Sequence, residues 1–221
     1  MSQSVRVGVL VSGNGSNLQA LIDASAAPDY PARISVVISN NPSAFALRRA
    51  QRANIPTIVL EHGSFATRDQ FEDALLQTLE KHQVELLCLA GFMRLLSPRF
   101  LRCFSGQVLN IHPALLPSFP GLHAPRQALA HGVKISGCTV HFVDEGTDTG
   151  PIILQAAVPV LPGDDEAALA ARILREEHLI YPTAVRWVAE GAVSLHGRMV
   201  RVQGEPEISD HALRNPGRRV P

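Results

Sequence analysis

The stretch of the sequence that decides the fold reads Val108-Leu109-Asn110-Ile111-His112-Pro113-Ala114-Leu115-Leu116-Pro117. Residues 107–111 predict a short buried strand, which Pro113 ends because proline cannot donate to a strand ladder. Asn110 and His112 lie two residues apart, so in a strand both side chains leave the same face. Polar groups at the end of an apolar strand, beside a loop, are typical of binding sites in open α/β sheets.

Two interpretations of this pair are equally supported by these residues alone. In the first, the Asn110 carboxamide and the His112 imidazole point at one reacting carbonyl, as a hydrogen-bond donor and an acid–base group. In the second, His112 is a hydrogen-bonded core histidine and Asn110 is a turn residue. The rest of the chain decides between them.

The order of apolar and amphipathic segments predicts an α/β protein with a doubly wound, mostly parallel sheet. Strands are expected at residues 5–11, 34–39, 57–60 and 85–90, and helices at residues 18–22, 43–53 and 67–82. Residues 137–143 and 152–160 predict a hairpin, which places an antiparallel strand near the C-terminal end. The last helix is expected at residues 164–189, with Pro182 kinking or interrupting it.

A glycine-rich turn follows the first expected strand and reads Ser12-Gly13-Asn14-Gly15-Ser16-Asn17. Such a turn before a helix presents backbone N–H groups and the positive end of the helix dipole, which suits a phosphate. The alternative is an ordinary tight turn. A dinucleotide fingerprint needs a glycine in place of Leu18 and an acidic residue after the second strand, and a Walker-type loop needs a lysine. The sequence has none of these, so the turn favours a monophosphate over NAD or ATP.

Bulk composition excludes several classes of protein. Lys+Arg and Asp+Glu both number 20, so the formal net charge is zero and no basic surface for nucleic acid is expected. The three cysteines, Cys88, Cys103 and Cys138, are far apart and show no metal-ligand spacing, which fits a reducing compartment. With no signal pattern and no membrane-spanning apolar segment, we expect a cytoplasmic protein without a metal and without a membrane partner.

The domain organisation is expected to be simple. Residues 1–203 predict a single domain, with a phosphate-binding half of about residues 1–105 and a catalytic half of about residues 106–203 that contains Asn110 and His112. The last segment, residues 204–221, is poor in apolar residues and contains three prolines. We expect it to form a frayed tail.

Seven motifs make the chain resemble the folate-dependent formyltransferases, and within them the branch that formylates glycinamide ribonucleotide. They are SGNGSN at 12–17, AGFMR at 90–94, LNIHP at 109–113, LLP at 115–117, PGLH at 120–123, DTGP at 148–151 and EHLIYP at 177–182. Each motif alone is weak, but the set follows the family's order from Val5 to about Met199. The resemblance implies transfer of the formyl group of 10-formyltetrahydrofolate to the amine of 5-phosphoribosylglycinamide, in de novo purine (IMP) biosynthesis.

The resemblance also implies roles for individual residues. The ribonucleotide would be held by Gly15, Ser16, Asn17, Leu174, Arg175, Glu176 and Glu177. The folate would be held by Arg68, Met93, Arg94, Leu95, Leu96, Asn110, Asp144, Glu145, Gly146, Thr147 and Asp148. The catalytic residues would be Asn110, His112 and Asp148. The partners would be small molecules, with 10-formyltetrahydrofolate as co-substrate, and a homodimer is left open.

The chemistry of formyl transfer explains this trio. A neutral amine attacks the formyl carbon, so the oxygen of the tetrahedral intermediate needs donors and the departing folate nitrogen needs a proton. Asn110 is a permanent N–H donor, and a carboxylate near His112 favours the imidazolium form, which is the role implied for Asp148. The alternative for Asp148 is a turn-forming residue, which is the stronger interpretation when the position is taken alone.

Two departures and two rival functions remain. Ser118 stands where the family commonly has a lysine or arginine, and Pro125 where it commonly has a second histidine, so we assign that loop no role beyond shape. A formyltetrahydrofolate hydrolase is the nearest rival, and the two are distinguished by whether formyl consumption requires glycinamide ribonucleotide. A non-catalytic nucleotide-binding module would explain the glycine-rich turn but not the trio.

Overall fold

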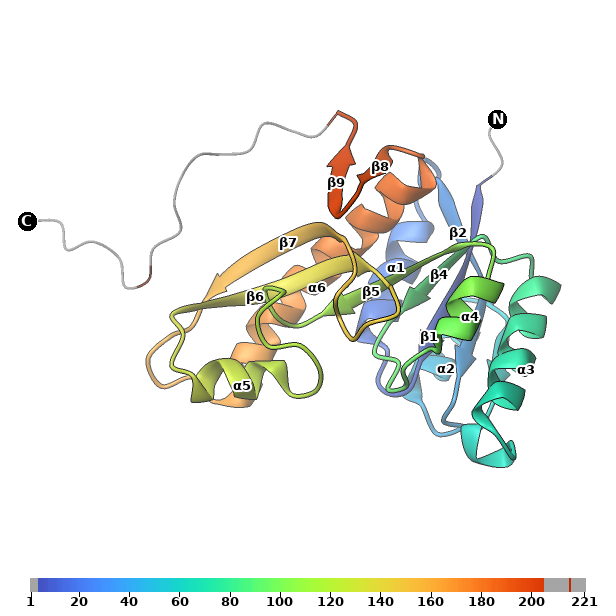
Figure 1. Ribbon diagram of the computed structural model, residues 1–221, viewed down its shortest axis with the longest axis horizontal. Helices are drawn as coiled ribbons and strands as arrows, with labels where there is room; N and C mark the ends of the chain where they lie inside the picture. Colours follow the sequence, from blue (N-terminus) through green and yellow to red (C-terminus); the bar gives the residue numbers. More distant parts are fainter. Residues whose placement is uncertain (1–3, 205–214, 216–221) are drawn as a thin grey trace, which may run out of the picture.

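A seven-stranded sheet in the order β3-β2-β1-β4-β5-β6-β7 forms the centre of the computed structural model, which describes residues 4–204 and 215 (Figure 1). The strands are β1 (Val5–Val11), β2 (Ala32–Ser39), β3 (Thr57–Val59), β4 (Leu86–Leu89), β5 (Gln107–His112), β6 (Ile135–Phe142) and β7 (Ile152–Pro159). Strands β1 to β5 pair in parallel, and β6 runs antiparallel to both β5 and β7. The predicted fold class is confirmed.

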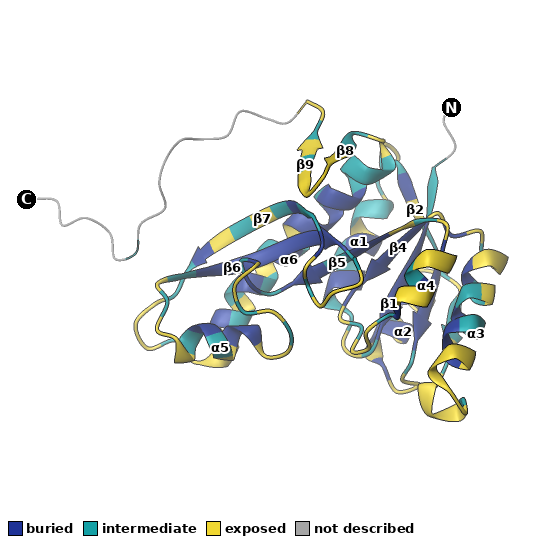
Figure 2. Ribbon diagram, in the orientation of Figure 1, coloured by how far each residue is buried: buried dark blue, intermediate teal, exposed yellow. Residues whose placement is uncertain are grey.

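Helices cover both faces of the sheet (Figure 2). They are α1 (Ser16–Ser25), α2 (Phe45–Arg52), α3 (Arg68–Lys81), α4 (Pro98–Cys103), α5 (Ala124–Ala130) and α6 (Glu166–Ala189). One core cluster joins the sheet to α1, α2, α5 and α6, and a second joins it to α3 and α4. Along β1, Val9 and Val11 belong to the first cluster and Leu10 to the second. Both faces of this strand are therefore buried, which explains why its sequence is a continuous apolar run.

The topology brings four loops to one edge of the sheet. Strands β1, β4 and β5 are parallel neighbours, so the loops at residues 12–15, 90–97 and 113–123 leave the same edge. The connection between β6 and β7, residues 143–151, folds back toward them. It starts at the opposite end of β5, where Val143 N donates to Val108 O at 2.8 Å, and it reaches the loop after β5 where Gly121 N donates to Asp148 Oδ2 at 2.8 Å.

Helix α6 corrects one expectation. It runs without interruption through Pro182, so the predicted interruption is wrong. Proline removes one N–H from the helix, but the neighbouring Tyr181 is fully buried against the sheet, and the Pro182 carbonyl accepts from Tyr30 Oη at 2.8 Å. Packing of the buried face therefore outweighs the lost hydrogen bond.

Three short elements were not predicted. They are the 3₁₀-helix η1 (His62–Ser64), helix α4, and a two-stranded antiparallel sheet formed by β8 (Val193–His196) and β9 (Met199–Val202). The expected frayed tail falls on residues that, apart from 204 and 215, lie outside the described part of the chain, and the division into two halves stays a prediction. Among the described helices, none combines the length and the apolar character that crossing a membrane requires.

Candidate active site

Strand β5 and the loop between β6 and β7 bring the predicted catalytic trio together. Asn110 and His112 leave the same face of β5, and His112 is only 4% exposed. Asp148 lies 38 residues after Asn110. Its Oδ2 is 3.4 Å from His112 Nδ1, and its Oδ1 is 3.4 Å from Asn110 Nδ2. A single carboxylate thus contacts both strand residues, one with each oxygen.

Both ring nitrogens of His112 face oxygen acceptors. Nδ1 faces the Asp148 carboxylate, and Nε2 lies 2.8 Å from the carbonyl oxygen of Phe119. A neutral imidazole carries one N–H and can donate to only one of these oxygens, whereas the protonated ring donates to both. The hydrogen-bonding surroundings therefore match the imidazolium form.

A fourth polar side chain, His141, joins this group and was not predicted as a site residue. The register of β5 and β6 places it opposite Asn110, and it is 2% exposed. Its Nδ1 lies 2.8 Å from Phe142 O and so carries a proton, while its Nε2 lies 3.2 Å from Asn110 Nδ2. The alternation of residues 137–143 could have placed a histidine on a buried face, but only the strand register identifies its neighbours.

The Asp148 carboxylate is held in its ionised form. Burial raises its pKa, but donors and positive charge around the carboxylate, among them the Gly121 N–H and the His112 ring, leave the pKa below its ordinary value. The backbone of Asp148 has a φ of +54°, a conformation that aspartate adopts more readily than most residues. The sharp loop conformation and the charge are therefore compatible at this position.

The Asn110 carboxamide is directed into this cluster. Its Nδ2 faces both His141 Nε2 and Asp148 Oδ1, and these two atoms lie 3.7 Å from each other. That separation lets one N–H be shared between the two acceptors. The second N–H of the amide is then available to a ligand.

Contacts from α2 hold the glycine-rich turn in place. Gly15 has a φ of +75°, and a Cβ there would lie 2.5 Å from Ala46 Cβ, so only glycine fits. Ala46 N donates to Gly13 O at 3.1 Å, and Arg49 donates to the backbone and side-chain oxygens of Asn14 at 3.0 and 2.9 Å. None of these contacts involves the backbone N–H groups at the start of α1, so those groups can bind an anion.

One buried hydrogen bond joins this turn to the residues of α6 that are predicted to bind the ribonucleotide. Asn17 Nδ2 donates to Glu177 Oε2 at 2.7 Å, and the two residues are 9% and 6% exposed. Asn17 Oδ1 has no partner among the described residues. Burial raises the pKa of Glu177, and the bond from Asn17 offsets only part of that rise. Of the other α6 residues in the set, Leu174 and Glu176 are half-buried and Arg175 is exposed.

The predicted folate residues after β4 are Met93, Arg94 and Leu95, which are exposed, and Leu96, which is half-buried. Met93 N donates to Ser12 Oγ at 2.9 Å, which ties this loop to the glycine-rich turn. Arg68 reaches the same loop from α3 and donates to Leu95 O at 2.6 Å. The exposed apolar side chains of Met93 and Leu95, at 63% and 67%, are the kind of surface that a ligand covers.

The remaining predicted folate residues lie in the loop that carries Asp148. Asp144 Oδ1 accepts from Gly146 N at 3.1 Å and from Thr149 Oγ1 at 2.6 Å, which closes the loop on itself. Glu145 pairs with Arg102 of α4 at 2.6 Å. The exposed members of the set in this loop are Glu145, Gly146 and Thr147.

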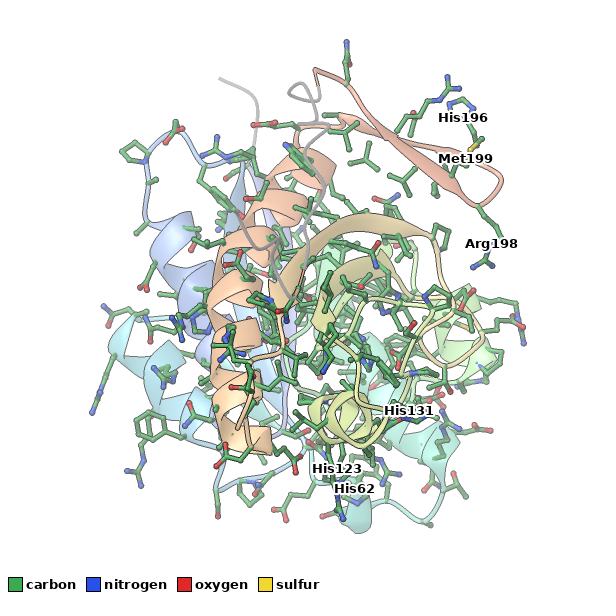
Figure 3. The ribbon with its side chains drawn as sticks, turned by 90° about the vertical axis from the view of Figure 1, so that its left-hand side faces the viewer. His62, His123, His131, His196, Arg198 and Met199 are labelled. Atoms are coloured by element: carbon green, nitrogen blue, oxygen red, sulfur yellow. The ribbon has the colours of Figure 1, made fainter. Side chains whose placement is uncertain are left out.

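Figure 3 labels His196, Arg198 and Met199 on the β8–β9 hairpin. Arg198, at the turn between β8 and β9, donates to Thr149 O at 2.6 Å, so the unpredicted hairpin reaches the loop that carries Asp148. His196 lies on the same hairpin, whereas His62 and His123 lie at the other end of the view. Within the described part of the chain, no group of three or more His, Cys, Asp or Glu side chains is arranged to hold a metal ion.

Comparison with known proteins identifies relatives that match this chain over the whole of its sheet. Residues 5–185 match the family model described as "Formyl transferase". The trifunctional purine biosynthetic protein adenosine-3 of Drosophila melanogaster is 53% identical over 188 residues, which cover 84% of this chain but only 14% of that protein. The phosphoribosylglycinamide formyltransferase of Escherichia coli is 43% identical over 201 residues, covering 91% of this chain and 95% of that protein.

Solved structures agree with this result. Glycinamide ribonucleotide transformylase 1 from Symbiobacterium toebii has a TM-score of 0.89 at 51% identity, and the match covers 92% of this chain and 96% of that one. The phosphoribosylglycinamide formyltransferase from Anaplasma phagocytophilum has a TM-score of 0.86 at 45% identity, covering 93% and 97%. Since the matched family region runs from β1 into α6 and includes both β5 and the Asp148 loop, this chain belongs to the formyl transferase family.

Proposed function

We propose that this chain transfers the formyl group of 10-formyltetrahydrofolate to the amine of 5-phosphoribosylglycinamide, as a phosphoribosylglycinamide formyltransferase of purine biosynthesis. The observation that carries the proposal is the bridge that Asp148 makes between Asn110 and His112. Formyl transfer needs donors at the formyl oxygen and a proton for the departing nitrogen, and this group of side chains offers both. The names of relatives that match this chain over nearly their whole length support the same reaction.

In the proposed reaction, the neutral amine attacks the formyl carbon and forms a tetrahedral intermediate with a negatively charged oxygen. The free N–H of Asn110 and an N–H of His112 donate to that oxygen. The bond between the formyl carbon and N10 of the folate then breaks. N10 takes up one proton while the attacking nitrogen releases one, so the number of protons is unchanged. Asp148 stays ionised and stabilises the imidazolium.

The mechanism requires one exchange of hydrogen-bond partners. In the described conformation, His112 Nε2 is paired with Phe119 O. We infer that the substrate oxygen replaces Phe119 O as the acceptor. Gly121, two residues further along, donates to Asp148 Oδ2, so the loop can release His112 while it remains attached to the carboxylate.

Each substrate has a place in this scheme. The phosphate of the ribonucleotide binds the turn at Gly15, Ser16 and Asn17, and Glu177 takes the glycinamide end, next to Leu174, Arg175 and Glu176. The folate lies against Arg68 and the loop from Met93 to Leu96 on one side. On the other side it meets the loop from Asp144 to Asp148. The bond between Met93 N and Ser12 Oγ supports this arrangement, because it places the two binding loops next to each other.

A steady-state assay with and without 5-phosphoribosylglycinamide tests the proposal. We expect consumption of 10-formyltetrahydrofolate to require the ribonucleotide, and His112→Asn to lower kcat by about 10²–10³-fold, the typical cost of losing one donor at a developing charge. His82→Asn is the matched control, because His82 follows the last turn of α3, at the edge of the sheet where β4 begins and opposite the edge where β5 ends at His112. Equal consumption without ribonucleotide would make the chain a hydrolase. Ribonucleotide binding without any formyl consumption would make it a non-catalytic nucleotide-binding module.

A further inference from the structure

Glu72 is a buried carboxylate with no role in the scheme above. It lies in the second turn of α3 and is 1% exposed. Three donors surround it: Arg68 Nε reaches Oε1 at 3.0 Å, Ser97 N reaches Oε1 at 2.8 Å, and Ser97 Oγ donates to Oε2. Burial of a carboxylate is costly, and this one is compensated by a set of donors drawn from two separate segments.

Those two segments are the ones that enclose the loop after β4. Ser97 ends this loop, and its Oγ also accepts from Phe100 N as the N-cap of α4. Arg68 uses its Nη2 to donate to Leu95 O at 2.6 Å. Glu72 therefore holds the loop at two points, directly through Ser97 and indirectly through Arg68 and Leu95.

The pairing of Arg68 with Glu72 is not explained by the stability of α3. A cation in the first turn of a helix opposes the helix dipole. An i,i+4 pair with the cation on the N-terminal side is also the weaker of the two possible orders. The Arg68 side chain remains 48% exposed even though its Nε and Nη2 are bonded. The arrangement fixes a cation at the surface beside the exposed Met93 and Leu95.

We propose that Glu72 is a positioning residue for the folate site, which aligns Arg68 and the loop from Met93 to Leu96 without touching the substrate. This inference rests on the proposed function, because it assumes that these residues contact 10-formyltetrahydrofolate. It assigns Glu72 and Ser97 a share in folate affinity and none in the chemistry of transfer. The loop meets the glycine-rich turn at Ser12, but Gly13 and Asn14 of that turn are held by α2, so ribonucleotide affinity should change far less than folate affinity when Glu72 is replaced.

The test is a comparison of Glu72→Gln with Asp73→Asn. The second variant is a matched control, because Asp73 is the next residue of α3 and its exposed carboxylate pairs with Arg99 of α4 at 2.6 Å rather than with Arg68 or Ser97. We expect Glu72→Gln to raise the KM for 10-formyltetrahydrofolate about tenfold, with kcat and the ribonucleotide KM within about twofold of wild type. Asp73→Asn should leave all three values within about twofold.

A double variant separates positioning from a general loss of stability. If Glu72 acts partly through Arg68, then Glu72→Gln added to Arg68→Ala should raise the folate KM by much less than Glu72→Gln raises it in the wild-type background. A purely structural role predicts independent, multiplying effects. Should Glu72→Gln not yield soluble protein, Ser97→Ala removes one donor to Glu72 and is expected to show the same rise in folate KM alone.

Calorimetric titration with tetrahydrofolate keeps this inference separate from the proposed reaction. If the wild-type chain binds tetrahydrofolate but does not formylate 5-phosphoribosylglycinamide, the proposed function fails. The ratio of the tetrahydrofolate Kd values of Glu72→Gln and Asp73→Asn still decides the role of Glu72. Unchanged folate KM and Kd in Glu72→Gln, or an equal rise in the KM of both substrates, would overturn the proposal.

Discussion

Replacing Asp148 with asparagine removes the charge at the centre of the site while keeping its shape. The side-chain oxygen of the new asparagine can remain at the Oδ2 position, where it accepts from Gly121 N, and the new amide can donate to His141 Nε2. Only the contact with Asn110 Nδ2 becomes donor against donor. Because asparagine also tolerates a positive φ, we expect Asp148→Asn to fold. Its effect should therefore report on catalysis.

The size of the effect follows from the distance between Asp148 Oδ2 and His112 Nδ1, 3.4 Å. At an effective dielectric constant of about 20, two unit charges at this separation attract by about 5 kcal/mol. This figure is an upper bound, because both side chains retain slight exposure, at 12% and 6%, and the amide oxygen keeps part of the interaction. If the activation free energy rises by about 3–4 kcal/mol, kcat falls by about 10²–10³-fold.

The assay is formyl transfer at saturating concentrations of both substrates, with Asp73→Asn as the control. A wild-type-like kcat in Asp148→Asn would show that the charge does not stabilise the imidazolium, and the proposed mechanism would fail. Thermal unfolding of both variants at pH 7 belongs in the same experiment. A fall in kcat accompanied by loss of folded protein would say nothing about the carboxylate, so kcat is expressed per folded molecule.

Two further predictions concern the charges on and next to α6. Burial raises the pKa of Glu177, so above pH 4.5, the ordinary pKa, its ionised carboxylate lowers the free energy of unfolding. Glu177→Gln should therefore raise Tm at pH 7. The same variant should raise the ribonucleotide KM more than the folate KM. A lower Tm at pH 7 would contradict this. The two bonds from Arg172 and the N–H of Leu161 lower the pKa of Asp164 to about 2 from 3.8, so its stabilisation is fully present above pH 3.8 and disappears as the pH falls toward 2. Urea unfolding should show Asp164→Asn less stable than wild type at pH 7 and equal to it at pH 2; a gap that persists at pH 2 would refute the assignment.

Local patterns were enough to predict the sheet and two of the four side chains of the candidate active site, Asn110 and His112. The buried strands appear as continuous apolar runs, and the two-residue period of a strand places Asn110 and His112 on one face without further information. The short elements escaped because their signals are weak. Helix α4 has six residues, and the β8–β9 hairpin is largely exposed, with Leu195 and Met199 at 47% and 64%.

Contacts between distant segments could not be derived in this way. Asp148 was selected by resemblance to a family, because nothing in residues 144–151 specifies which strand their side chains meet. His141 was missed because its position opposite Asn110 depends on the register of β5 and β6, which is set by packing of the whole sheet. Glu72 was missed for a related reason, since a glutamate on an amphipathic helix is indistinguishable by pattern from a solvated one until Ser97 is placed against it.

The way in which the four contacts are divided between the Asp148 oxygens has a mechanical consequence. Oδ2 takes the two contacts that involve the loop, Gly121 N and the His112 ring that Phe119 also holds, whereas Oδ1 faces Asn110 and His141 on the sheet. A shift of Phe119 alone would therefore free His112 Nε2, while Gly121 N stays on Oδ2 and both Oδ1 contacts stay in place. Asn110 and His112 both lie on β5, whose position the core fixes, so the substrate oxygen can replace the Phe119 carbonyl as acceptor without movement of either side chain.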